Sequence, residues 1–165
     1  MDSMDGEKKQ WQRDKAASDI YISEIKHILV DIPELHIIDI GTDQEDKEEN
    51  TDLKVLLSKD LRIGVRVRTW GFHKYAAQFT IRSCRYSGIK TEHAKIMEGW
   101  GNYFFYGFGD GQKILYWTFA DLDIFRVANV EGTQYKNDDG SSEFLVYRWD
   151  QFPSNFRIAG GYAKE

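Results

Sequence analysis

The chain has 165 residues and a formal net charge of -5 at pH 7, with 41% apolar and 30% charged residues. This length and composition are typical of one globular domain with its own hydrophobic core. The sequence has no apolar run of about 18 or more residues, so we expect no contact with a membrane through a spanning helix. Cys84 is the only cysteine, which excludes an internal disulfide and a multi-cysteine zinc site.

The N-terminal stretch, residues 1–13, is polar and has no apolar signal core. We interpret it as a flexible leader, followed by a single domain over residues 14–165. A chain without a secretory signal is expected inside the cell, which predicts a cytoplasmic location in a bacterium or a phage-infected cell.

A helix is predicted first in this domain, over residues 18–32. Ile25, Ile28, Leu29 and Ile32 recur at the spacing of one buried helix face, and Pro33 ends the pattern. A short apolar strand is then expected over residues 35–41, followed by a polar loop.

Three strands are expected next, over residues 52–57, 62–70 and 78–83, because apolar and polar side chains alternate there. A loop is expected between the last two strands. The remaining predictions are a helix over 91–99, a hairpin of 102–108 and 113–120, a helix over 121–128, a polar loop over 129–142, a strand over 142–152 and a Gly-rich tail. This order predicts an α+β domain with a central mixed sheet flanked by helices.

Charge is unevenly placed along the chain. Residues 39–60 contain eight acids and three lysines, whereas residues 62–95 contain eight Lys and Arg and one acid, Glu92. The basic segment is the part of the chain that could meet a polyanion. The alternative is that the two segments neutralise each other across the fold.

Asp52 and the tripeptide Arg66-Val67-Arg68 form the pattern that bears most directly on function. Over residues 18–108, the order helix, strands, helix, strand resembles the core of the PD-(D/E)XK nuclease superfamily, the restriction-endonuclease-like fold. In that family an acid begins the second core strand, and an E-x-K or D-x-K tripeptide lies on the third. Asp52 matches the first position and Arg66-Val67-Arg68 falls at the second. The segments FTIRS, TEHAKI and GWGNYFFYGF also look like those of uncharacterised phage and prophage proteins.

The resemblance implies a metal-dependent nuclease, in which two carboxylates hold Mg²⁺ or Mn²⁺ and a lysine steadies the attacking oxygen. Here the family's charges of about -1, -1 and +1 are replaced by those of Asp52, Arg66 and Arg68. Arg66 cannot bind a metal ion, whereas Arg68 could do the electrostatic work of the lysine.

A relocated carboxylate would restore the metal site that the resemblance implies. Glu24 is the first candidate, because it lies at the edge of the buried face of the first predicted helix, and some family members take an extra ligand from that helix. Asp39, Asp60 and Glu92 are weaker candidates, because no spacing places them near Asp52. The alternative for Glu24 is an ordinary solvent-exposed residue, and for Asp52 an acid that pairs with Arg66 or Arg68.

A phosphate-binding face is the competing interpretation of the same strands. If the strands over 62–70 and 78–83 pair, strand parity brings Arg66, Arg68 and Arg82 together. Arg85 and Lys90 would follow close behind. Such a group would bind phosphates with strong salt dependence, unless acids of the loop before Asp52 neutralise it.

Two hypotheses follow. The first is a divergent nuclease that hydrolyses DNA or RNA, with Asp52 and Glu24 as metal ligands and Arg68 stabilising charge. The second is a nuclease-like fold without catalysis, which binds a nucleic acid through its arginines or binds another protein.

Overall fold

The structure is a computed structural model, and it describes residues 12–13, 15–16, 19–32, 38–40, 53–56, 60–85 and 88–163. Asp52, the acidic loop before it and most of the proposed leader lie outside these ranges. None of the helices in the described part of the chain has the length and apolar character needed to cross a bilayer.

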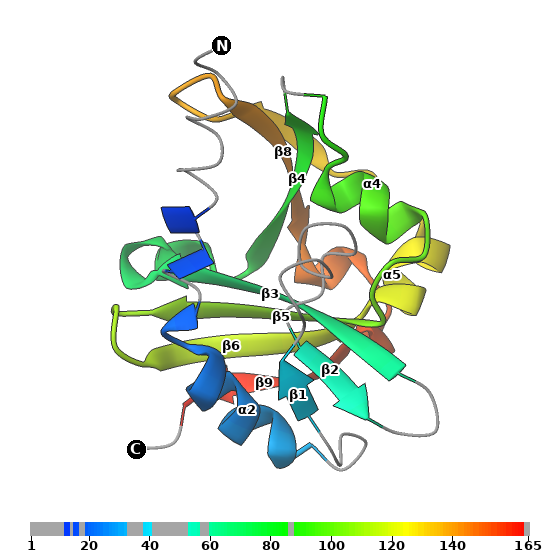
Figure 1. Cartoon of the computed structure of the whole chain (residues 1–165). Coiled ribbons are helices and arrows are strands. Elements are labelled where there is room, and N and C mark those ends of the chain that lie inside the picture. The colour runs from blue at the N-terminus through cyan, green and yellow to red at the C-terminus, as the bar shows by residue number, and fades with distance from the viewer. Residues whose placement is uncertain are drawn as a thin grey trace.

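The predicted α+β class is confirmed, but the strands divide between two sheets (Figure 1). The large sheet has six strands, in the order β1 (Ile38–Ile40), β2 (Leu53–Leu56), β3 (Asp60–Thr69), β5 (Tyr103–Gly109), β6 (Ile114–Asp121) and β9 (Arg157–Tyr162). The small sheet has three, in the order β4 (Gln78–Arg85), β8 (Ser142–Arg148) and β7 (Thr133–Lys136).

The two faces of the large sheet are covered differently. Helix α2 (Ile22–Val30) packs on one face, where Ile25 and Leu29 meet Ile63 and Phe105. The small sheet lies over the other face (Figure 1). The shorter helices are α4 (Glu92–Met97), α5 (Leu122–Ala128) and the 3-10 segments η1 (Trp70–Tyr75), η2 (Trp149–Gln151) and η3 (Ser154–Phe156).

Strand β3 connects the two halves of the large sheet. β1, β2 and β3 pair antiparallel, whereas β5 runs parallel to β3 and places Tyr106 beside Arg66. A parallel neighbour requires a crossover connection, and here the chain passes through η1, β4 and α4 before β5 begins.

The strand over residues 78–83 does not pair with β3, so the condition for bringing Arg66, Arg68 and Arg82 together on one sheet is not met. β2 and β5 occupy the two edges of β3, so β4 has no free edge there and pairs antiparallel with β8 instead. The polar loop predicted over 129–142 contains β7, and the Gly-rich tail contains β9, which pairs with β6. The loop predicted before β4 is the 3-10 segment η1.

Side chains cap the N-termini of α4 and α5. Thr91 accepts a hydrogen bond from the Ala94 N–H at 3.3 Å, and Asp121 accepts from the N–H groups of Asp123 and Ile124. These bonds satisfy N–H groups that have no partner within the helix, which is why α4 and α5 begin where they do.

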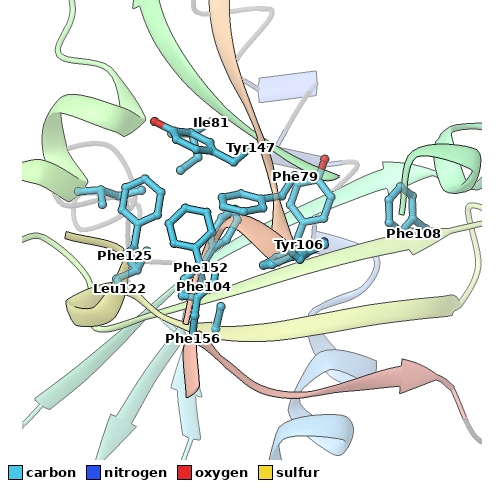
Figure 2. Packing of buried hydrophobic residues seen from close by; sticks show 13 residues of the cluster. Phe79, Ile81, Phe104, Tyr106, Phe108, Leu122, Phe125, Tyr147, Phe152 and Phe156 are labelled. Carbon is cyan, nitrogen blue, oxygen red and sulfur yellow. The ribbon is translucent and has the colours of Figure 1, made fainter. Parts of the chain in front are cut away.

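Phe79 of β4 lies at the centre of the core between the sheets (Figure 2). Its ring is in contact with rings from the large sheet, from β8, from α5 and from η2 and η3. The nearest is Trp149, at 4.2 Å between ring centroids. The seven partners are Phe104, Tyr106, Phe125, Tyr147, Trp149, Phe152 and Phe156.

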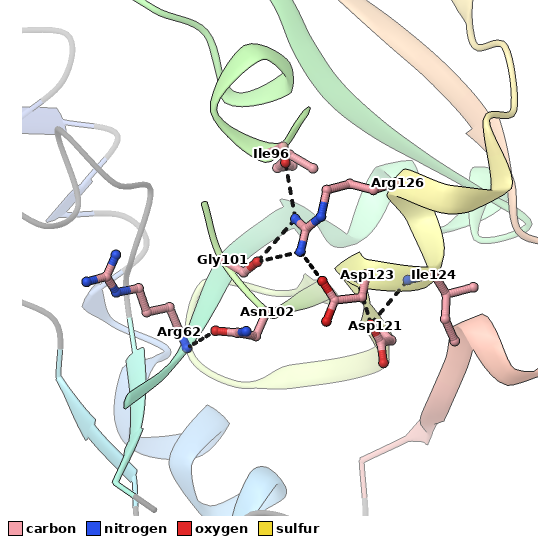
Figure 3. Close-up of polar contacts among 8 residues, drawn as sticks. All are labelled: Arg62, Ile96, Gly101, Asn102, Asp121, Asp123, Ile124 and Arg126. Atoms are coloured by element: carbon pink, nitrogen blue, oxygen red, sulfur yellow. Dashed lines mark hydrogen bonds and ion pairs between the residues drawn. The ribbon is translucent and has the colours of Figure 1, made fainter. Parts of the chain in front are cut away.

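Arg126 of α5 joins the ends of other elements through its guanidinium (Figure 3). It donates to the carbonyl oxygens of Ile96 at 3.1 Å and Gly101 at 3.3 Å, and it forms an ion pair with Asp123. The carbonyls at the end of α4 and before β5 are thereby paired, which fixes the connection that leads into β5.

We expect Phe79→Ala to lower the free energy of unfolding by about 3–5 kcal/mol, because it removes a buried ring and leaves a cavity. Phe72→Ala, at an exposed phenylalanine, should cost less than about 1 kcal/mol. Urea unfolding of both variants measures the difference. Equal losses would contradict the central position of Phe79 in the core.

Candidate nucleic-acid interface

Strand β3 places Arg66 and Arg68 on the face of the large sheet that the small sheet overlies. Val65 and Val67 alternate with them and pack toward α2 on the opposite face. The same alternation puts Tyr106, the neighbour of Arg66 on β5, in the core between the sheets. Both arginines are therefore half-buried at the rim of this core.

Arg66 is neutralised within the fold by Glu92, the first residue of α4. The side chains are 23% and 10% exposed, so this ion pair is largely screened from water. The same Glu92 oxygen accepts a hydrogen bond from the Arg82 backbone N–H at 3.1 Å. Glu92 thus connects the large sheet, the small sheet and the positive end of a helix.

Arg68, two residues further on the same face, has a different environment. It donates from Nη1 to the Thr80 hydroxyl at 3.1 Å, and that oxygen lies 3.3 Å from the hydroxyl of Tyr106. The guanidinium carbon is 4.4 Å from the ring centroid of Phe72. No acid among the described residues pairs with Arg68, so its positive charge is not neutralised by this part of the chain.

The other predicted cations are placed on or after β4. Arg82 lies near this group, since its backbone binds Glu92 and Thr80 precedes it by two residues. Arg85 ends β4 opposite Ser142, and Lys90 forms an ion pair with Glu98 at 2.5 Å. The arginines of β3 and β4 therefore lie in two different sheets, not side by side in one sheet. Hydrogen bonds from Ser141 lower the pKa of Asp139, and the positive charge of Arg82 helps to lower it.

Glu24 lies on the other side of the large sheet, because α2 covers the face opposite Arg66 and Arg68. Its Oε2 accepts a hydrogen bond from the Ile114 N–H at 2.5 Å, at the start of β6. It also lines a small open pocket with Trp70, Lys113 and Tyr162. The structure does not bring Glu24 to the arginines of β3.

The residues that the structure describes do not by themselves fit a metal site. They include no group of three His, Cys, Asp or Glu side chains that could hold a metal ion. Glu92 is the carboxylate in contact with β3, and it is paired with the Arg66 guanidinium. Asp52, the first motif position, lies outside the described residues.

Glu92 was a weak candidate in the sequence, and Thr80, Tyr106 and Phe72 were not candidates at all. A helix N-terminal Glu reads as an ordinary partner of the helix dipole. Threonine and tyrosine in strands of alternating polarity are typical of ordinary surface or core positions. The signal that joins them is tertiary, since the packing of β4 over β3 brings them together.

His93 follows Glu92 in α4 and is half-buried. Burial lowers the pKa of His93 below 6.5, and the Glu92 charge opposes this shift in part. Below pH 6.5 the unfolded chain therefore binds more protons at this residue than the folded chain does. The stability that the neutral imidazole contributes is lost as the pH falls through this window.

We expect Arg66→Met to lower the free energy of unfolding by about 1–3 kcal/mol, because it leaves the Glu92 carboxylate buried without its partner. In a double-mutant cycle with Glu92→Gln, the coupling energy should be about 1–2 kcal/mol. The exposed pair Lys90–Glu98 is the matched control, with an expected coupling below about 0.5 kcal/mol. Equal coupling in both cycles would contradict a buried Arg66–Glu92 pair.

We expect His93→Gln to reduce the loss of stability between about pH 7.5 and 5.5, because the glutamine cannot take up a proton. Urea unfolding at both pH values measures this slope. His27→Gln, at an exposed histidine of α2, should leave the slope closer to that of the unchanged chain. A steeper slope in His93→Gln would refute the assignment.

Comparisons with known proteins add no assignment to this geometry. No protein-family model matches the chain, and no curated protein matches its sequence. The interpretation of the site therefore depends on the contacts described above.

Proposed function

We propose that this chain binds the phosphate backbone of a nucleic acid. The binding surface lies on a restriction-endonuclease-like core, in which β3 presents guanidinium groups. The observation that carries this proposal is the difference between two arginines on one face. Arg66 has an internal acid, whereas Arg68 has none among the described residues. A half-buried guanidinium that no described acid neutralises favours the binding of an external anion.

The chemistry of Arg68 suits a phosphate. A guanidinium carries five N–H donors in a rigid fork that matches two phosphate oxygens, and it remains charged at any physiological pH. One donor is used by Thr80, which fixes the orientation of the group. Charge-assisted bonds to phosphate are stronger than bonds between neutral groups.

The topology supports the resemblance on which the choice of a nucleic acid rests. A helix, α2, precedes three antiparallel strands, and a second helix, α4, precedes a strand parallel to the third. This is the order helix, strands, helix, strand, with β4 as an addition between β3 and α4. On this resemblance, β3 would correspond to the strand on which the family carries its E-x-K tripeptide, and Arg66 and Arg68 would lie at that motif.

A second candidate function is nucleic-acid cleavage, and the position of Glu92 favours it. The helix α4 brings this carboxylate to Arg66, the residue that replaces the motif acid. A bound Mg²⁺ or Mn²⁺ would supply an activated water and stabilise charge on the phosphate. The described residues do not form a metal site, and the Glu92 carboxylate already forms an ion pair with Arg66. Phosphate binding therefore remains our first proposal.

We expect Arg68→Gln to weaken binding of a DNA or RNA duplex and to reduce the slope of log K against log salt by about 1, since about one phosphate contact is lost. Glutamine can retain the hydrogen bond to Thr80. Fluorescence anisotropy of labelled duplexes over a salt series measures both quantities. The control is Lys136→Gln on β7, an exposed cation paired with Glu143, which should change the slope less. An unchanged slope in Arg68→Gln would overturn the proposal.

Incubation of labelled DNA and RNA with Mg²⁺ or Mn²⁺ separates the two candidates. Cleavage that is lost in both Asp52→Ala and Glu92→Gln would establish the nuclease. Retention of the probe without cleavage supports the binding module. If the chain neither cleaves nor retains the probes, both candidates fail, and the protein partner considered from the sequence becomes the hypothesis to test.

A further inference from the structure

The segment η1 is a 3-10 helix, and its geometry sorts its side chains into columns. With three residues per turn, positions i and i+3 lie one above the other. Trp70 and His73 show this directly, since their rings stack with 4.1 Å between centroids and 14° between planes. His73 in turn contacts the rings of Phe108 and Tyr116, so this column faces the large sheet.

Phe72 and Tyr75 form a second column of the same helix, and this one faces solvent. The two side chains are 43% and 50% exposed. Three residues of 3-10 helix separate them along the axis by about 6 Å. The fold thus holds two aromatic rings in water on one side of a short rigid segment.

A cation accompanies each exposed ring. The Arg68 guanidinium carbon lies 4.4 Å from the centroid of Phe72, and the Lys74 ammonium lies 5.1 Å from the centroid of Tyr75. No Asp or Glu occurs in the sequence between Asp60 and Glu92. The exposed aromatic rings therefore lie beside two positive charges. The stretch of chain that carries them contains no acid.

η1 is also fixed at both ends. Trp70 and His73 anchor it on the large sheet, as described above. After its last turn, the Ala76 carbonyl accepts a hydrogen bond from the Trp149 indole N–H at 3.0 Å, and the Ala77 carbonyl accepts from the Trp149 backbone N–H at 3.1 Å. The exposed rings are thus held in place before any ligand arrives, which lowers the entropic cost of binding.

We propose that η1 is a base-stacking platform for single-stranded nucleic acid. Phe72 and Tyr75 stack on unpaired bases, while Arg68 and Lys74 contact the phosphates that link those bases. This inference rests on the proposed function and gives the class of substrate. Exposed aromatic rings beside cations are the combination that single-stranded nucleic acids bind, because every base has a face that can stack.

A duplex does not satisfy the same surface. Its bases are already stacked on their neighbours, so their faces are closed to an external ring unless the duplex opens. A duplex can still bind through Arg68, which contacts phosphate alone. We therefore expect the preference for single strands over duplexes to depend on Phe72 and Tyr75. The affinity for both kinds of nucleic acid should depend on Arg68.

The test compares the full chain with the double variant Phe72→Leu/Tyr75→Leu, in which exposed apolar side chains remain but the rings are lost. Anisotropy is measured with a labelled oligothymidylate and with a duplex of the same length. We expect the affinity for the single strand to fall by about tenfold or more, and that for the duplex to change by less than about twofold. The more conservative variant Phe72→Tyr/Tyr75→Phe should retain the affinity for the single strand.

Tyr135→Leu provides the matched control, because Tyr135 is another exposed tyrosine, on β7 of the small sheet. The affinity of the Tyr135→Leu variant for the single strand should equal that of the unchanged chain. If the double variant binds oligothymidylate as tightly as the unchanged chain, the platform is refuted while duplex binding through Arg68 can stand. If the unchanged chain binds neither probe, the proposed function and the platform both fail.

Discussion

The packing of the small sheet on the large sheet is the constraint on which the rest of the structure depends. Phe79 supplies its centre, with ring contacts to both sheets, to α5 and to the two 3-10 segments after β8. Because these rings fill the space between the sheets, β4 is held over the face of β3 that carries Arg66 and Arg68. The polar contacts at the rim of this core follow from that placement.

A half-buried guanidinium must find hydrogen-bond partners, since an unsatisfied polar group in such a position is costly. The fold meets this requirement in two ways on one strand. Arg66 receives an acid from α4, whereas Arg68 receives a hydroxyl from β4 and the face of an aromatic ring. Within the described part of the chain, the first arrangement neutralises a positive charge, and the second orients a positive charge without an acid beside it. The two arginines therefore differ in their surroundings, although they occupy equivalent positions in the alternating pattern of the strand.

The connection from β3 to β5 carries most of the candidate interface. It holds η1 with its exposed rings, β4 with Thr80, and α4 with Glu92. A parallel crossover must leave the sheet and return to it, so this segment has room to build a second layer above β3. The features that favour phosphate binding and those that favour cleavage thus arise from the same crossover, which is why Arg66 and Glu92 bear on both.

The sequence by itself determined most of the helices and the longer strands. Helix periodicity located α2, strand alternation located β3 and β4, and cap residues located the starts of α4 and α5. The hairpin of β5 and β6 also follows from its turn and its two apolar arms. These features depend on interactions within a few residues, so the order of side chains is sufficient to predict them.

Tertiary structure alone decided the partners. β4 pairs with β8 because both edges of β3 are occupied, and the Gly-rich residues of β9 form a strand because β6 offers them a free edge. Glu92 meets Arg66, and Phe72 meets Arg68, only after the two sheets are packed. Such contacts join residues whose separation along the chain carries no periodic signal, so the physical cause is the competition among strand edges and apolar faces in the folded chain.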